Sequence, residues 1–354
     1  MQISRRAFSL SMAAATCCGA PARAADPEPF VSSHPLYTAS VDLLARERWS
    51  DLVSSVAALP PQSAFTLLTD LGDGSPLVGD LKGLARVNGG AGVAGAIQVG
   101  WAWRLRGSTE KVVDENGFAR HLVAAGEMLI RAQQHDHNDG VTVGFLFRVL
   151  KGAGETEALH ALLPAYLSAE RRPVEGLAHY ADAVSAKWLG SETEALTFAR
   201  HYAGSAPAAS FGLVPDTHIT AAVARQMSDD ASVKASAPAY FESPDVNTEI
   251  LAANGRFLAA PVDADPFAAV LAHAQFSMAF LQMNDVEHTR QHLIAQGMSA
   301  VGPWRYLENP TAALARVRSA LRLNLTAGVD DRGINAVGHS KFASAGVTEP
   351  QLGS

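Results

Sequence analysis

Apolar residues recur at helical spacing along most of this chain. Between 116 and 132, for example, Phe118, Leu122, Ala125 and Leu129 follow one another at intervals of four, three and four residues. At 3.6 residues per turn this spacing puts them on one face of a helix, with polar residues on the other. The pattern predicts an all-α protein.

The clearest organisation lies in 155–202, which predicts three short helices joined by tight turns. The second has its apolar stripe over 174–188 and is expected to end at Leu189-Gly190. Ser191 and Glu194 have the spacing of a capping box, which predicts that Ser191 accepts from the amide of Glu194 and that the Glu194 carboxylate accepts from the amide of Ser191. A third helix should therefore begin at this point.

Each of these helices has a single apolar face and needs a neighbour on either side. The expected fold is a stack of antiparallel helix pairs, a tetratricopeptide-like α-α superhelix that is irregular in places. Asp216 is expected to cap a short helix in the irregular part, and Asp265, which precedes Pro266, is expected to cap a helix beyond it. The expected division is an export signal over 1–24, a leader over 25–36, helical repeats over 37–203, an irregular connection over 204–244, further helical repeats over 245–327 and a flexible tail over 328–354.

The first 24 residues have the pattern of an export signal. A basic start precedes an apolar run, and Arg5-Arg6 followed by Phe8 is typical of the twin-arginine route, although an ordinary secretory signal is the alternative. Both cysteines, Cys17 and Cys18, lie inside this segment. The expected location is therefore periplasmic or secreted, with no stable membrane anchor.

The net charge of the chain also limits its partners. The sequence has 28 basic and 35 acidic residues, a formal net charge of −7. Removal of the signal takes away three arginines and no acid, leaving 25 basic residues against 35 acidic ones. A chain this acidic is not expected to bind nucleic acid.

Trp101, Trp103 and Arg104 bring aromatic and guanidinium groups closest together in the sequence. Two tryptophans two positions apart point in different directions on a helix, so at least one is expected to be partly exposed or covered by a later segment. One interpretation is core packing. The other, which we take as the candidate partner-binding site, is a groove for a ligand or peptide.

The loop from His135 to Asp139 contains two histidines and two carboxylates, ligand types that suit zinc. Loops between helices favour Asp and Asn for backbone reasons, and Asp139 has the position of a helix cap. We therefore assign no metal and no cofactor, and keep metal binding as an alternative. His160, His179 and His201 fall on successive predicted helices and are interpreted as structural histidines.

Three segments carry a resemblance to a known family: Asp136 to Asp139 before a helix, then Lys187-Trp188-Leu189-Gly190-Ser191-Glu192-Thr193-Glu194, then Phe198-Ala199-Arg200. Together they resemble a poorly characterised bacterial family of tetratricopeptide-like helical-repeat proteins. The resemblance implies a helical-repeat fold in which Lys187, Trp188, Gly190, Ser191 and Glu194 form a structural motif. It implies no activity and no catalytic residue.

These observations favour an exported scaffold that binds a protein or peptide, because stacked helix pairs present an extended surface and no catalytic motif stands out. One alternative is an all-α polysaccharide lyase or hydrolase, which would require two acids close together. The second alternative is a metal-binding protein that uses the loop from His135 to Asp139.

Overall fold

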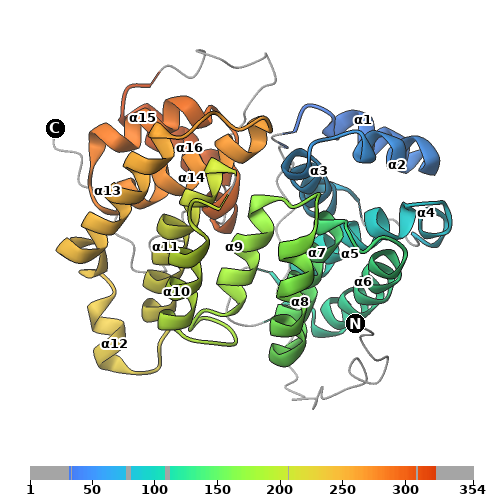
Figure 1. Cartoon of the computed structure of the whole chain (residues 1–354), viewed down its shortest axis with the longest axis horizontal. Helices are drawn as coiled ribbons and strands as arrows, with labels where there is room; N and C mark the ends of the chain where they lie inside the picture. The colour runs from blue at the N-terminus through green and yellow to red at the C-terminus, as the bar shows by residue number, and fades with distance from the viewer. Residues whose placement is uncertain are drawn as a thin grey trace. The chain divides into compact units, whose positions relative to one another are not determined.

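The computed structural model describes residues 32, 34–76, 81–107, 112–205, 207–307 and 310–323, and every regular element within these ranges is a helix (Figure 1). The all-α class predicted from the sequence is confirmed. The predicted export signal (1–24) and flexible tail (328–354) lie outside the described residues.

The α-helices are α1 (Tyr37–Ala45), α2 (Trp49–Ala57), α3 (Pro61–Gly74), α4 (Lys82–Arg86), α5 (Gly90–Arg106), α6 (Glu115–His135), α7 (Gly140–Ala153), α8 (Thr156–Ser168), α9 (Val174–Ala183), α10 (Glu192–Tyr202), α11 (Leu213–Gln226), α12 (Ala231–Ser236), α13 (Pro244–Ala259), α14 (Pro266–Gln282), α15 (Val286–Gln296) and α16 (Pro310–Ala320). Three short 3-10 helices accompany them: η1 (Ala208–Gly212), η2 (Tyr240–Glu242) and η3 (Gly302–Tyr306).

Helix α5 packs against α3, α6 and α7. Its apolar residues are buried on several sides, and at one point the backbones of α3 and α5 approach closely through two glycines. A Cβ atom on Gly72 would lie 2.7 Å from Gly100 Cα. Only glycine allows this approach. It brings the C-terminal halves of α3 and α5, which carry polar and charged side chains, close together.

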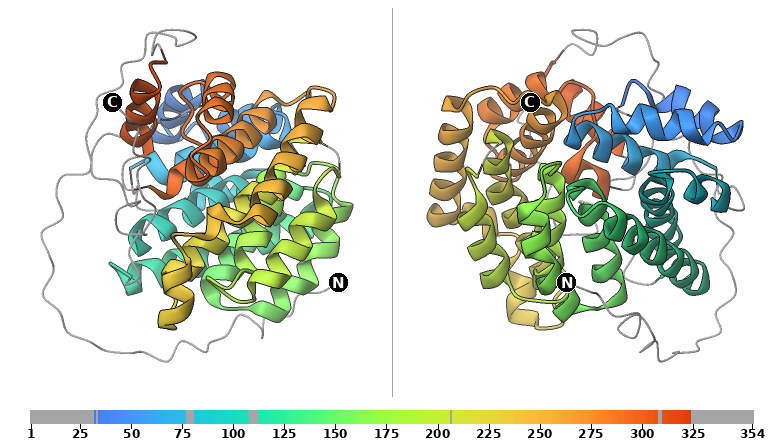
Figure 2. Two further views of the ribbon diagram at one scale, coloured as in Figure 1. Left: turned by 90° about the vertical axis from the view of Figure 1, so that its left-hand side faces the viewer. Right: turned by 45° about the vertical axis from the view of Figure 1, so that its right-hand side comes forward.

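The three helices predicted in 155–202 are present as α8, α9 and α10, and α9 packs against α7, α10 and α11 (Figure 2). Ser191 caps α10 by accepting from the amide of Glu194, as predicted. The reciprocal half of the box was wrong, because the amide of Ser191 donates to the carbonyl of Val184 instead. The predicted end of the second helix was also wrong, since α9 stops at Ala183.

A compact turn explains this early end. The amide of Leu189 donates to the carbonyl of Ala183, and that of Gly190 donates to the carbonyl of Ser185. These bonds fold the chain back before another helical turn can form. Trp188 consequently lies in the turn and not on the apolar stripe of α9.

The stretch 204–244, expected to be irregular, contains α11 and α12 together with η1 and η2. Asp216 lies inside the first turn of α11, which begins at Leu213, so it is not the cap of that helix. The carboxylate of Asp263 accepts from the amides of Ala208 and Ala209 and anchors η1. These hydrogen bonds fix the start of the connection to the segment that precedes α14.

Asp265 caps two helices at once. Its side chain accepts from the amide of Phe267 at the start of α14, as predicted, and also from the amides of Gln62 and Ser63 at the start of α3. This joins segments about 200 positions apart in the sequence. Within the described ranges, no helix is both long and apolar enough to span a lipid bilayer.

Candidate functional site

Helix α3 carries polar side chains at successive turns of a buried face. Gln62 and Thr66 are buried, and Asp70 is only 1% exposed, whereas Asp73 at the end of the helix is in part accessible. Burial of polar groups is costly unless each finds a partner. Gln62 finds one in α9, where its amide donates to the Glu175 carboxylate at 2.8 Å and accepts from the Glu175 backbone at 3.0 Å.

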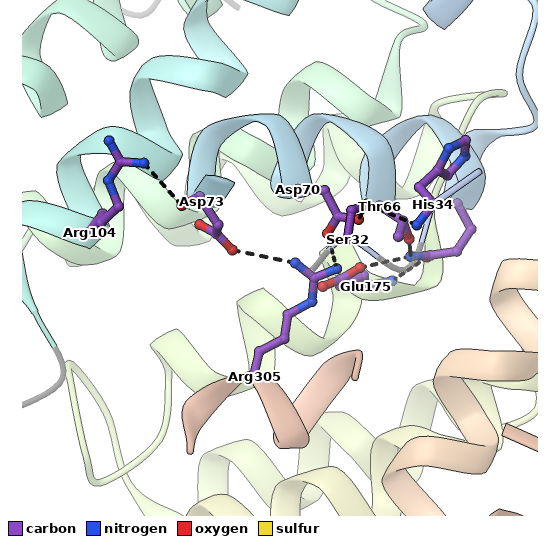
Figure 3. Close-up of polar contacts among 9 residues, drawn as sticks. Ser32, His34, Thr66, Asp70, Asp73, Arg104, Glu175 and Arg305 are labelled. Carbon is purple, nitrogen blue, oxygen red and sulfur yellow. Dashed lines mark hydrogen bonds and ion pairs between the residues drawn. The ribbon is translucent and has the colours of Figure 1, made fainter. Parts of the chain in front are cut away.

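Asp70 and Asp73 receive Arg305, which reaches them from η3 (Figure 3). The guanidinium lies 2.7 Å from Asp70 Oδ1 and 3.4 Å from Asp73 Oδ2. Glu175 lies beside the same guanidinium in Figure 3. We define Asp70, Asp73, Glu175 and Arg305 as the ion cluster.

Burial governs the protonation of the ion cluster. It raises the pKa of Glu175 and the pKa of Asp73, and the cations Arg305 and Arg148 oppose this rise without reversing it. Burial acts to lower the pKa of Arg305, but the carboxylates of Asp70, Glu175 and Asp73 raise it above its ordinary value. Arg305 therefore stays charged. The carboxyl groups of Glu175 and Asp73 release their protons less readily than ordinary carboxyl groups do.

Helix α7 brings two cations toward α9. Lys151 is buried and pairs with Asp182 at 2.5 Å. Burial acts to raise the pKa of Asp182, but Lys151 and Lys187 lower it below its ordinary value. Burial lowers the pKa of Lys151, and the Asp182 carboxylate opposes this change without reversing it. Arg148, one turn before Lys151, makes no ion pair within the described part of the chain, and its buried Nη1 atom has no hydrogen-bond partner there.

Two tryptophans from distant segments meet beside Lys151. Trp103 of α5 and Trp188 of the turn after α9 pack edge to face, with centroids 5.5 Å apart and planes at 89°. The Lys151 ammonium lies 4.6 Å from the Trp103 centroid and 4.9 Å from that of Trp188. The Arg106 guanidinium lies over both rings and the Lys187 ammonium lies over Trp188. We define Trp103, Arg106, Lys151, Lys187 and Trp188 as the basic–aromatic patch.

His179 and Asp216 are influenced by charges of opposite sign. Burial, followed by the charges of Arg148, Lys151 and Arg305, lowers the pKa of His179 well below its ordinary value. Burial, followed by the carboxylates of Asp182 and Glu175, raises the pKa of Asp216 to about 8. The surroundings are thus positive at His179 and negative at Asp216, and perturbed groups of both signs gather here, as they do at many functional sites.

The structure separates the three residues predicted to contact a partner. Trp101 is fully buried, and its indole N–H donates to Ser75 Oγ at 3.2 Å, so its side chain presents no surface to a partner. Arg104 is exposed and donates to the carbonyls of Asp73 and Ser75 at the end of α3. Trp103 is part-exposed and belongs to the basic–aromatic patch.

The motif around Trp188 divides in the same way. Lys187 and Trp188 belong to the basic–aromatic patch, whereas Ser191 and Glu194 form the start of α10. A Cβ atom on Gly190 would lie 2.2 Å from the carbonyl oxygen of Val184, so the turn requires glycine. Sequence reasoning assigned all five residues a structural role, but two of them lie at the candidate site.

The aspartates in the loop from His135 to Asp139 form hydrogen bonds within the loop and at the start of α7. Both histidines are exposed. The Asp136 carboxylate accepts from the amide of Asn138, and Asp139 caps α7 by accepting from Thr142, as predicted. Across the residues that the structure describes, no three His, Cys, Asp or Glu side chains gather closely enough to hold one metal ion.

Sequence reasoning missed Arg148, Glu175, Asp182 and Arg305, and it assigned Asp216 only a capping role and His179 only a structural one. A signal was present in part: Glu175, His179 and Asp182 recur at four and three residues within an otherwise apolar helix. This spacing puts the three side chains on one face of the helix, away from the apolar stripe, and their burial in the folded chain is what indicates a polar site inside the stack.

Comparison of the chain with protein-family models, with curated proteins and with solved structures found no match.

Proposed function

We propose that this chain is an exported helical-repeat protein that binds a protein or peptide partner at the basic–aromatic patch. The observation that carries the proposal is the contact of Trp103 with Trp188, both part-exposed, among Arg106, Lys151 and Lys187. Tryptophan and arginine are the residue types that most often dominate binding energy at protein interfaces. The all-α architecture supports the same function, because packed helices present an extended surface.

The test is a pull-down of periplasmic extract on the purified protein without residues 1–24. We expect a specific partner to be retained by the wild type and lost from Trp103→Ala. Trp49→Ala is the matched control, because Trp49 is also part-exposed and lies on α2, outside the patch. Equal retention by all three proteins would contradict the proposal.

A second candidate function is an all-α polysaccharide lyase or hydrolase. The observation in its favour is the Asp216 carboxyl, whose pKa of about 8 suits a general acid, near the charges of Glu175 and Asp182. Release of reducing or unsaturated ends from acidic and neutral polysaccharides, lost in Asp216→Asn but kept in Trp49→Ala, would favour this function over the scaffold.

A further inference from the structure

Arg148 is a cation of this region whose charge is not directly paired by any residue that the structure describes. The guanidinium makes no ion pair within the described ranges, although Asp73 and Glu175 are near enough for their pKa values to respond to it. Its Nη1 atom is buried and forms no hydrogen bond there. A buried donor without an acceptor is costly, so its retention calls for a partner that the folded chain does not supply.

Other groups of this region lack partners in the same way, among them Trp103 and His179. The indole Nε1 of Trp103 is buried and forms no hydrogen bond within the described chain. His179 is 7% exposed and its Nε2 atom is also unpartnered. Lys151 links the three residues, because it lies against the Trp103 ring, follows Arg148 by one turn of α7 and acts electrostatically on His179.

The chemistry of these groups defines what is missing. Indole and guanidinium nitrogens can only donate, so the complement must accept hydrogen bonds. The charges acting on His179 are all positive, so the complement is favoured if it is an anion. A carboxylate supplies two acceptor oxygens and the negative charge, and its geometry matches a guanidinium.

We infer that the site receives a carboxylate side chain of the bound partner, with Arg148 as its ion-pairing residue and Trp103 as a second donor. The inference rests on the proposed function and specifies its ligand as an acidic segment. Bound in this way, the carboxylate would satisfy donors from α5 and α7 and would offset the positive surroundings of His179.

The test uses two synthetic peptides, Ac-Gly-Glu-Gly-Glu-Gly-amide and its isosteric glutamine analogue, titrated calorimetrically into the protein without residues 1–24. We expect the acidic peptide to bind the wild type at least about tenfold more tightly than the analogue. Arg148→Gln should remove this difference. Arg131→Gln, on the exposed face of α6, changes the net charge equally and should keep it.

A second measurement does not depend on any variant. The carboxylate should raise the pKa of the His179 imidazole, followed by NMR, because it opposes the cations around that ring. An acidic peptide that fails to bind, binds no better than its analogue, or leaves the His179 pKa unchanged would overturn the inference. So would discrimination that persists in Arg148→Gln.

The two proposals can fail separately. If a periplasmic partner depends on Trp103 but is retained equally by Arg148→Gln, the scaffold function stands and the carboxylate inference fails. If Arg148→Gln abolishes discrimination between the peptides while Trp103→Ala still retains the periplasmic partner, the carboxylate site stands and the patch is not the recognition surface.

Discussion

Arg305 and Arg148 act electrostatically on the same carboxylates, Asp73 and Glu175, yet they are held in opposite ways. Arg305 makes two ion pairs and ties η3 to α3, whereas Arg148 makes none within the described residues. A paired buried charge is a cross-link between distant segments. A buried charge without an ion pair costs stability and is available to a ligand, and this contrast separates the ion cluster from the candidate site.

The largest effect is expected from Arg305→Met. Removal of the guanidinium leaves Asp70, 1% exposed, without its counter-ion, and should lower the free energy of unfolding by about 3–5 kcal/mol. Urea denaturation followed by tryptophan fluorescence measures the change. The double variant with Asp70→Asn should recover much of the loss. If Arg305→Met alone were as stable as the wild type, the ion pair with Asp70 would not stabilise the fold.

Asp265→Ala tests the other end of α3. The substitution removes caps from α3 and α14 together, so we expect a loss of about 2 kcal/mol in the free energy of unfolding. Asp230→Ala, which removes the cap of the six-residue α12 alone, is the control and should cost about half as much. Similar losses for the two variants would mean that the contact between α3 and α14 adds no stability.

Asp216→Asn tests a carboxyl group of the candidate site, outside the ion cluster. Because the folded pKa of Asp216 is raised to about 8, its contribution to stability is fully present below the unfolded value near 4 and is lost as pH rises toward 8. The neutral amide should therefore stabilise the protein by about 2 kcal/mol at pH 8, allowing for partial exposure, and by almost nothing at pH 4. Thermal unfolding at the two pH values measures this difference, and a pH-independent effect would contradict it.

The smallest effect is expected from Arg148→Met. No ion pair is lost and a buried donor without an acceptor is removed, so the free energy of unfolding should stay the same or rise by up to about 1 kcal/mol, whereas Arg305→Met should lower it by several times that amount. The same urea titration compares the two variants directly. Comparable destabilisation would show that Arg148 also holds the fold together and would end the distinction between the two arginines.

The sequence by itself determined the helices and several of their ends. Ser191, Asp139 and Asp265 cap the helices at which they were expected, because a cap bonds to an amide only two or three residues away. The end of α9 at Ala183 was not predicted. The stripe continues to Trp188, but backbone bonds within the following turn outweigh that periodicity.

Only the tertiary structure decided which charges lie together. Arg305 and Asp70 are 235 positions apart, and no local spacing relates them. The same holds for Trp103 and Trp188, which the sequence placed in two unrelated motifs. Side-chain chemistry fixes what each group can bind, but burial and the packing of distant helices decide whether the fold supplies a partner, as for Arg305, or leaves one to be supplied, as for Arg148.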